Sequence, residues 1–536
     1  MSRRNWLLLA LFAIVWFAGI GYRDLIKTDE GRYAEIAREM VASGDWLTPR
    51  LDDLKYFEKP PLQYWTTAAA YTVLGENEFA ARLWPTLLSF FGVLLAVYAG
   101  RRLFDATTGL IAGAVLASSL LFSAMGHFNA LDAGFGVFLE LAVFSFVFAQ
   151  SGDRRWMLVA WAGLALAVLS KGIAALVLTG GTLVLYSILS RDLSPWRKLS
   201  PLPGLALFLA IAAPWFVAVS LANPEFARFF FIHEHFERFL TTVHGRYEPA
   251  WYFIPVLVVG ALPWTGLFLQ SLSSLWARQG DGFQLQRFLL LWCIVVFGFF
   301  SASGSKLPSY ILPLFPALAL LTAVGLTGLS RKALLAHLAV IAFIALAASL
   351  FAGRVAMLGE NDTAGAAAEG YALWLRIAAL LWLVSALVAL ILAIRERRRD
   401  AILSLAIGAL LAGSGALLGH QHFGHFMSAK SLAAAVKPHL PAGVPFYSVR
   451  MYEQTLPFYL DRTLTLVDYQ DELAFGIAQE PAKWVPSVAE FEQRWKTDED
   501  AFAVMDLNTY SDFVARGLPM REIARDSRRI VVRKTT

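Results

Sequence analysis

Residues 371–394 read YALWLRIAALLWLVSALVALILAI, a run of 24 positions with one charged side chain, Arg376. A helix needs about 20 apolar residues to cross the roughly 30 Å of hydrocarbon in a bilayer, so this run predicts a membrane span. Similar runs recur through the 536 residues, of which 57% are hydrophobic and 16% are charged. Soluble domains carry about 25% charged residues. The composition therefore excludes a disordered chain and an ordinary soluble enzyme.

Apolar runs of this kind predict an all-α polytopic membrane protein with thirteen spans. They lie near residues 5–22, 81–103, 107–125, 130–150, 156–170, 172–190, 202–222, 251–275, 285–302, 310–328, 333–352, 371–394 and 401–419. The short loops on one side collect basic residues, namely Arg3, Arg4, Arg101, Arg102, Arg154, Arg155, Arg191, Arg197, Lys198, Arg278, Arg287, Arg331, Lys332, Arg395, Arg397, Arg398 and Arg399. This positive-inside bias predicts a cytoplasmic N-terminus and places 23–80, 223–250 and 353–370 outside. Because the number of spans is odd, we expect the C-terminus outside as well.

The character of the chain changes near residue 428, so we expect a transmembrane part over 1–427 and a small α/β domain over 428–536. In the second part, the patterns predict strands at 444–449, 463–467, 501–505 and 529–533, and helices at 430–438, 451–460 and 487–497. Over 421–536, Lys and Arg do not outnumber Asp and Glu. A nucleic-acid footprint needs a basic excess, so nucleic acid is not an expected partner.

The first outside loop is more charged than the rest of the chain, and it begins with residues 27–40, KTDEGRYAEIAREM. Apolar residues at 33, 36, 37, 40 and 41 share one face, which predicts an amphipathic helix lying on the membrane surface. Thr28 is placed to cap this helix, and Asp29 and Arg32, three residues apart, project the same way. A solvated connector with a capping box is the alternative interpretation.

Lys59 lies between Glu58 and the pair Pro60-Pro61, which stiffens the loop before a second helix expected at 61–75. A charged loop clamped between two amphipathic helices at the membrane face favours a site for a lipid head group.

Two further signals lie at the outer ends of later spans. Asp132 begins the fourth span, where a carboxylate is costly and marks a functional site by default; an interfacial helix cap is the alternative. Lys306 and Tyr310 lie between the ninth and tenth spans and suit a phosphate held at the interface, against ordinary snorkelling and an aromatic belt. Lys171, between two short spans, is expected at a surface.

The sequence gives little support for metal or nucleotide chemistry. Cys293 is the only cysteine, which excludes a Cys-based zinc or iron–sulfur site. His233 and His235 are two apart and face different sides of a helix, so at most one of them can join a carboxylate from the first loop at a metal. No glycine-rich phosphate loop is present. A transferase acting outside therefore needs a donor already activated in the membrane, such as a polyprenyl-phosphate sugar.

Several segments resemble one bacterial family in their order and spacing. They are 28–40 (TDEGRYAEIAREM), 43–46 (SGDW), 56–60 (YFEKP), 170–172 (SKG), 251–255 (WYFIP) and 306–310 (KLPSY). These segments are similar to those of the lipid A 4-amino-4-deoxy-L-arabinose transferases, which are polyprenyl-phosphate-dependent glycosyltransferases of the GT-C architecture. The resemblance extends over residues 1–330 and implies that fold, with an outward C-terminal domain.

The resemblance also implies an activity. Such an enzyme moves the amino sugar from undecaprenyl phosphate to a phosphate of lipid A on the periplasmic face of the inner membrane. This lowers the negative charge of lipid A and weakens polymyxin binding. We expect the enzyme to act as a monomer surrounded by membrane lipids.

Residue roles follow by similarity alone. The candidate catalytic carboxylates are Asp29, Asp132 and Glu30. The candidate substrate-binding residues are Arg32, Lys59, Lys306 and Tyr310. Glu58 with His235 resembles a position that can hold a divalent ion such as zinc, although no essential cofactor is expected.

Two other functions remain open. The family often has one proline where this chain has Pro60-Pro61, and related enzymes with such changes use other sugars or acceptors. If the acceptor were a protein or glycan hydroxyl, Asp29 would act as general base. A lipid-linked sugar flippase is the second alternative, but transporters usually carry their charges near the midplane, and here the charges crowd the outer face. A purely structural scaffold leaves the first-loop charges unexplained.

Overall fold

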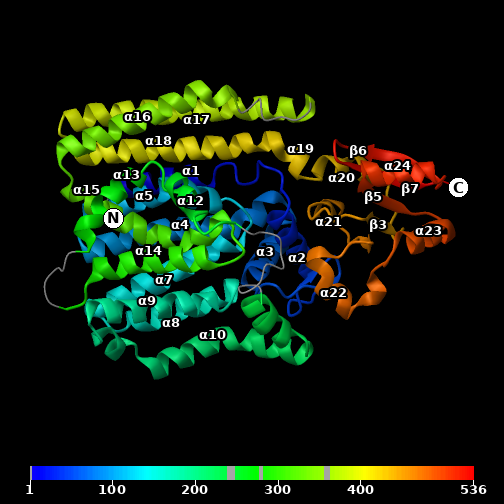
Figure 1. Cartoon of the computed structure of the whole chain (residues 1–536), viewed down its shortest axis with the longest axis horizontal. Helices are drawn as coiled ribbons and strands as arrows, with labels where there is room; N and C mark the ends of the chain where they lie inside the picture. The colour runs from blue at the N-terminus through cyan, green and yellow to red at the C-terminus, as the bar shows by residue number, and fades with distance from the viewer. Residues whose placement is uncertain (1–2, 238–247, 277–281, 355–361, 536) are drawn as a thin grey trace.

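The computed structural model describes residues 3–237, 248–276, 282–354 and 362–535. Long helices lie side by side in one bundle, and a smaller part with a β-sheet lies beyond one end of it, next to α2 and α3 (Figure 1). We call this the capped end of the bundle. The bundle helices are α1 (Arg3–Phe17), α4 (Glu78–Leu103), α5 (Ala106–Ser118), α6 (Leu120–Met125), α7 (Leu131–Gln150), α8 (Trp156–Lys171), α9 (Ala174–Ser190), α10 (Pro201–Ala222), α12 (Phe253–Gly260), α13 (Thr265–Leu275), α14 (Leu285–Ala302), η3 (Pro308–Leu314), α15 (Phe315–Gly328), α16 (Arg331–Phe351), α17 (Asp362–Ile394) and α18 (Arg398–Gly419).

Each of the predicted spans corresponds to a helix or to a broken helix. Within the described residues, eight helices are long and apolar enough to cross a membrane, and α1, α5, α8 and α9 are apolar but shorter. The breaks fall between α5 and α6, between α12 and α13, and between η3 and α15. Pro263 lies in the second break and Pro313 lies inside η3, just before the third; the missing N–H of each proline removes a helical hydrogen-bond donor. The exact number of helices that cross the bilayer stays a prediction.

The first loop folds into two helices and a short hairpin, whose elements are α2 (Asp29–Ser43), β1 (Arg50–Leu51), β2 (Leu54–Lys55) and α3 (Leu62–Leu74). The two turn residues of the hairpin, Asp52 and Asp53, have φ values of 56° and 61°. Aspartate tolerates this left-handed conformation better than most residues. The carboxylate of Glu39 accepts hydrogen bonds from both turn N–H groups, so α2 holds the hairpin in place.

The predicted position of α2 on the membrane surface is wrong. Residues 30–40 are all buried, so protein covers every face of the helix. Its apolar residues pack in one cluster with residues of α3 and of the C-terminal part, including Tyr71 and Tyr452. Within α2, Nη2 of Arg38 lies 2.6 Å from Oε1 of Glu35. An apolar helix face suits a protein partner as well as a lipid surface, and here the partner is protein. Thr28 precedes α2 as predicted, but its side chain makes no capping hydrogen bond.

Residues 428–535, the C-terminal α/β part, contain a five-stranded sheet in the order β4-β3-β5-β7-β6. The strands are β3 (Phe446–Val449), β4 (Thr465–Val467), β5 (Phe502–Asp506), β6 (Met520–Arg525) and β7 (Arg529–Lys534). β4, β3 and β5 are parallel, and β7 and β6 continue the sheet antiparallel. Four of these strands overlap the predicted ones. β6 was not predicted because this edge strand, MREIAR, shows no apolar alternation.

Helices cover both faces of the sheet, which explains why residues 446–449 of β3 and 502–505 of β5 are all buried. The flanking helices are α20 (Lys430–Val436), α21 (Leu456–Leu460), α22 (Ala474–Gln479), α23 (Val488–Thr497) and α24 (Leu507–Ala515), with the short turn η7 (Asp471–Leu473) before α22. Phe491 and Trp495 of α23 pack on one face, and Leu432 and Leu456 pack on the other.

The C-terminal α/β part contacts the first-loop hairpin directly. Glu480 lies 3.0 Å from Nη1 of Arg50 and accepts from the backbone N–H of Lys55 at 3.0 Å. The carboxylate of Asp52 accepts from the backbone N–H of Leu464 at 2.6 Å. The sheet is therefore fixed against the segment that follows the first predicted span.

Candidate active site

The first turn of α2 joins three charged side chains. Nη1 of Arg32 lies 3.2 Å from Oδ1 of Asp29, as their spacing predicted. Nη2 of Arg32 donates to Glu472, which the C-terminal α/β part contributes. The side chain of Arg32 is 6% exposed, whereas that of Asp29 is 33% exposed. Asp29 is therefore the member of this group that a substrate can reach most easily.

Arg32 stays charged although it is buried. Burial lowers its pKa, but Tyr56, Glu472 and Asp29 together hold the pKa above its usual range. Nε of Arg32 and the hydroxyls of Tyr56 and Tyr64 are buried and have no hydrogen-bond partner among the described residues. Buried polar groups are normally satisfied, and leaving one unpaired is costly. These groups are therefore available to a bound anion or sugar.

Glu30 is engaged by a buried arginine of α4. Its Oε1 and Oε2 lie 2.7 and 2.8 Å from Nε and Nη2 of Arg82. Oε1 also accepts from the backbone N–H of Asn129 at 3.0 Å. Burial raises the pKa of Glu30, but Arg82 and the Asn129 bond hold the pKa below its usual range. Both oxygens are occupied, so these contacts favour a role in holding the site together, and a catalytic role for Glu30 stays a prediction.

Arg82 also fastens the chain segments around the site. Besides Glu30, it donates to three carbonyl oxygens in the loop after α1, those of Ile20, Arg23 and Asp24. Asn129, which precedes α7, accepts from Gln63 of α3 at 2.8 Å. These bonds fix the starts of α2, α3 and α7 relative to one another, and Asp29 and Asp132 lie on two of those starts.

Asp132 forms an ion pair with Lys171, the last residue of α8. The ammonium group of Lys171 also lies 4.2 Å from the ring centre of Tyr310, in η3. The side chain of Lys171 is 13% exposed, and its predicted position at a membrane surface stays a prediction. Tyr33 is affected by both groups: burial raises its pKa, and Asp29 of the first group and Asp132 of the second raise it further.

The two remaining lysines are also engaged. Nζ of Lys59 lies 3.3 Å from Oε2 of Glu234 and donates to the carbonyl oxygen of Glu58 at 2.8 Å. Nζ of Lys306 donates to the carbonyl oxygens of Ser303 and Glu248. The structure thus brings Lys59 to the capped end, and it turns Lys306 toward backbone. A substrate-binding role for either lysine stays a prediction.

A cavity of about 950 Å³ opens between the segment after α10, which includes the π-helix η2 (Arg228–Glu237), and the C-terminal α/β part. It is lined by Glu58, Pro224, Glu225, Arg228, Phe229, Ile232, His233, Glu234, Gln470, Asp471, Glu472, Ala474, Phe475 and Gln479. Five of these residues are acidic, which makes the cavity suited to a positively charged or hydroxyl-rich ligand. We call it the acid-lined cavity. Its volume lies within the range of small-molecule sites, about 300–1,000 Å³.

The predicted metal position at Glu58 and His235 finds no support here. The side chain of His235 lies outside the described residues. In the part of the chain that the structure describes, no three His, Cys, Asp or Glu side chains come together as a metal site requires. The ammonium group of Lys59 already places a positive charge beside Glu234. A metal site at Glu58 and His235 therefore stays a prediction.

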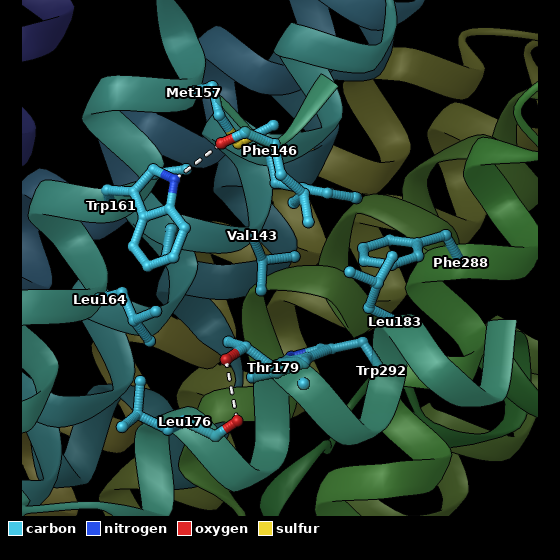
Figure 2. A pocket seen from close by; sticks show the side chains of 14 residues that line it. Val143, Phe146, Met157, Trp161, Leu164, Leu176, Thr179, Leu183, Phe288 and Trp292 are labelled. Carbon is cyan, nitrogen blue, oxygen red and sulfur yellow. Dashed lines mark hydrogen bonds between the residues drawn. The ribbon is translucent and has the colours of Figure 1, made fainter. Parts of the chain in front are cut away.

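A second, apolar pocket lies between α7, α8, α9 and α14 (Figure 2). Its volume is about 240 Å³, and its wall includes Val143, Phe146, Leu164, Leu183 and Phe288. The polar atoms in view are satisfied locally, as in the hydrogen bond from Trp161 Nε1 to the carbonyl oxygen of Leu199 at 2.9 Å. The pocket therefore offers a hydrocarbon-like lining to an apolar ligand.

Sequence reasoning missed several residues of the site. Arg82 and Lys171 each stand at the end of an apolar run, and the rule that marked Asp132 would have marked them too. Tyr56 and Tyr64 look like ordinary interfacial aromatics. Glu472 gave no signal, because its partner lies 440 positions earlier in the chain.

Comparison with known proteins first defines a class. Residues 58–217 match the family model described as dolichyl-phosphate-mannose-protein mannosyltransferase. The fold is shared with the archaeal oligosaccharyltransferase AglB from Archaeoglobus fulgidus, solved with dolichol-phosphate, at a TM-score of 0.52 and 13% identity over 96% of this chain and 71% of that one. The chain therefore has the fold of the GT-C transferases.

A narrower relationship follows. Residues 432–534 match the model described as aminoarabinose transferase C-terminal domain. The crystal structure of ArnT from Cupriavidus metallidurans bound to undecaprenyl phosphate is similar at a TM-score of 0.95 and 37% identity, covering 100% of this chain and 99% of that one. The chain belongs to the aminoarabinose transferase family, which confirms the resemblance seen in the sequence.

A curated relative supports the same family membership. The undecaprenyl phosphate-alpha-4-amino-4-deoxy-L-arabinose arabinosyl transferase 1 of Proteus mirabilis is 35% identical over 60% of this chain and 59% of its own length. The chain thus matches about three fifths of the curated relative's length.

Proposed function

We propose that this chain is an integral membrane glycosyltransferase that moves 4-amino-4-deoxy-L-arabinose from undecaprenyl phosphate to a phosphate of lipid A. The observation that carries the proposal is the full-length structural similarity to a relative solved with undecaprenyl phosphate. The buried cations and carboxylates at the capped end, beside an acid-lined cavity, supply groups that such a reaction needs.

The protein is placed in the bacterial inner membrane with the capped end in the periplasm. The distribution of basic loops supports this orientation, with the N-terminus in the cytoplasm and residues 428–536 forming a periplasmic α/β domain. Lipid A in the outer leaflet and the head group of the donor would then meet at the same face. The monomer is the working unit in this proposal.

The chemistry is a substitution at the anomeric carbon of the sugar. A phosphate oxygen of lipid A forms a bond to that carbon while the bond from the carbon to the undecaprenyl phosphate oxygen breaks and its electron pair stays on the leaving phosphate. The acceptor phosphate is ionised near pH 7, because its second pKa is around 6. No strong general base is therefore needed, unlike transfer to a hydroxyl.

The charged side chains take roles that follow from this step. Arg32 and Lys59 are proposed to stabilise the leaving phosphate by charge-assisted hydrogen bonds. Asp29 and Asp132 are proposed to position the sugar, to receive its amino group and to stabilise the positive charge that develops on the ring. Lys171 forms an ion pair with Asp132 and holds its carboxylate in place.

The apolar pocket between α7, α8, α9 and α14 is proposed to hold part of the prenyl chain (Figure 2). It begins at Leu176, five residues beyond Lys171 on the chain. An oily chain whose phosphate lies near Lys171 would therefore run along α8 and α9 to fill the pocket.

Mass spectrometry of lipid A tests the proposal. Cells that express the wild-type chain should show a mass increment of one aminopentose on lipid A, and cells that express Asp29→Asn should not. An unchanged lipid A profile with normally folded wild-type protein would refute the assignment. A sugar appearing on a protein or glycan instead would favour a hydroxyl acceptor.

A further inference from the structure

The contact between Arg32 and Glu472 joins two parts of the chain that the proposed function treats separately. Arg32 lies in the first turn of α2, and Glu472 lies in η7 of the C-terminal α/β part. Both side chains are buried, with exposures of 6% and 9%. The other carboxylate oxygen of Glu472 accepts from Nε2 of Gln454 at 2.9 Å. Glu472 is thus held in place from its own part of the chain and aimed at the arginine.

The backbone of the two parts is arranged for this contact. Gly31 precedes Arg32, and a Cβ atom added to it would lie 2.6 Å from Cγ2 of Thr455 and 2.8 Å from the carbonyl oxygen of Gln454. Contacts this short do not occur for real Cβ atoms, so only glycine allows the approach. Gln454, which donates to Glu472, and its neighbour Thr455 therefore pack directly on the first turn of α2. The ion pair results from this close docking.

The charges around Arg32 do not balance. One guanidinium faces two carboxylates, Asp29 and Glu472, before any substrate is present. The donor brings a phosphodiester with one negative charge, and transfer converts it to a phosphomonoester with a charge of about −1.5 to −2 at pH 7. Asp29 and Glu472 therefore oppose the phosphate, and they oppose the product more than the donor.

We propose that Glu472 occupies the phosphate-binding Arg32 until the lipid phosphate displaces it. Through this contact, the C-terminal α/β part weakens the binding of the phosphate product. This inference rests on the proposed function, because it takes Arg32 as a ligand of the lipid phosphate. Glu472 is a positioning residue here: it acts through Arg32 and touches no reacting atom.

The consequence is a defined effect on turnover. The donor phosphate binds Arg32 by displacing Glu472. After transfer, the Glu472 carboxylate competes with the more highly charged product phosphate for Arg32. Glu472 thus favours product release at the cost of tight binding. Removing its charge should strengthen phosphate binding and slow release.

The test measures binding of decaprenyl phosphate to the full-length protein in detergent micelles by isothermal titration calorimetry. We expect Glu472→Gln to bind about tenfold more tightly than the wild type, as the loss of one partly screened repulsion a few ångströms away implies. Steady-state transfer should show KM and kcat both lowered for this variant. A merely structural role would raise KM instead.

The matched control is Glu480→Gln. Glu480 also belongs to the C-terminal α/β part and also pairs with a first-loop arginine, Arg50, at 3.0 Å. It does not contact Arg32, so its loss should leave decaprenyl phosphate affinity within about twofold of the wild type. If Glu472→Gln binds decaprenyl phosphate no more tightly than the wild type while the control is unchanged, this inference is overturned and the proposed function is not.

Other outcomes separate the inference from the proposed function. If the wild type fails to bind decaprenyl phosphate, both are overturned. If Glu472→Gln does not fold, a cryo-electron microscopy structure of the wild type with decaprenyl phosphate decides the question. The inference requires Glu472 to have left Arg32 in that complex, and an intact pair beside bound phosphate refutes it.

Discussion

Lys171 at the end of α8 and Asp132 at the start of α7 form an ion pair beside the ring of Tyr310, although the two residues are 39 positions apart. Neither residue is exposed by more than 13%. The pair places one positive and one negative charge at the capped end, where the proposed donor phosphate and sugar would lie. In the proposed mechanism this pair contributes to both the fold and the chemistry, and mutations can separate the two.

Lys171→Met should lower both stability and transfer. Breaking a buried pair leaves an uncompensated charge and costs about 3 kcal/mol. Loss of a transition-state contact lowers kcat by about 100-fold or more. The double variant Lys171→Met/Asp132→Asn should recover most of the stability without the activity. Thermal unfolding and transfer assays on the three proteins check this, and a double variant no more stable than the single one would contradict it.

Asp29→Asn should lower kcat by about 10² to 10³ while the protein remains folded. Asp29 is one-third exposed and forms an ion pair with Arg32, so the substitution affects packing little. Transfer kinetics and melting temperature, measured on the same preparation, provide the comparison. Near-normal transfer would remove Asp29 from the reacting centre.

Unlike Asp29→Asn, which should leave the protein folded, Glu30→Gln should cause a large loss of stability. Glu30 is fully buried and holds Arg82 through two short contacts, so the variant leaves a buried guanidinium without its counter-charge, at a cost of about 3–5 kcal/mol. The folded-state pKa of Glu30 is depressed below its ordinary 4.5, so the pair's contribution is present above pH 4.5 and disappears as pH falls through the lower value. The difference in unfolding free energy between wild type and variant should therefore shrink below pH 4.5. A constant difference would contradict the assignment.

Asp52→Asn should stabilise the protein at neutral pH. Burial raises the pKa of Asp52 well above its usual range, and its Oδ2 has no partner among the described residues. An acid whose folded-state pKa is raised weakens the fold as pH rises above its unfolded value, here 3.8. The asparagine keeps the acceptor for Leu464 and tolerates the left-handed turn, so we expect a gain of about 1 kcal/mol at pH 7.5 that vanishes toward pH 4. Unfolding curves at several pH values would show it, and a destabilised variant at pH 7.5 would refute it.

Gly31→Ala should weaken the docking of the C-terminal α/β part by about 1–3 kcal/mol, because a methyl group there overlaps Thr455 and Gln454. Gly298→Ala in α14 is the control, since a Cβ atom at Gly298 meets no atom of the described chain within 4 Å. Limited proteolysis between the helical bundle and residue 428 measures the docking. Equal protection of the two variants would show that the close approach at Gly31 is unimportant.

The sequence predicted those features that depend on neighbouring residues. Apolar runs located the helices of the bundle, and the spacing of Asp29 and Arg32 predicted their contact. Charge in an apolar run drew attention to Asp132, which forms an ion pair with Lys171. In each case the signal lies within one element or one turn of helix, where spacing determines geometry.

Features that depend on tertiary packing were not predicted. The same amphipathic pattern that suggested a surface helix belongs to α2, which is buried because the C-terminal α/β part covers it. The pairing of Lys171 with Asp132 was not predicted, because it depends on α7 packing beside α8. Glu472 meets Arg32 only because the sheet docks on the first loop, and one sequence contains no signal for a partner so far away.

The acid-lined cavity has a pharmacological consequence. It lies at the end of the bundle that we place in the periplasm, and its size suits a drug-like molecule. A cationic inhibitor that filled it would reach its target without crossing the inner membrane. By keeping lipid A anionic, such a compound would preserve the attraction that brings positively charged peptide antibiotics to the cell.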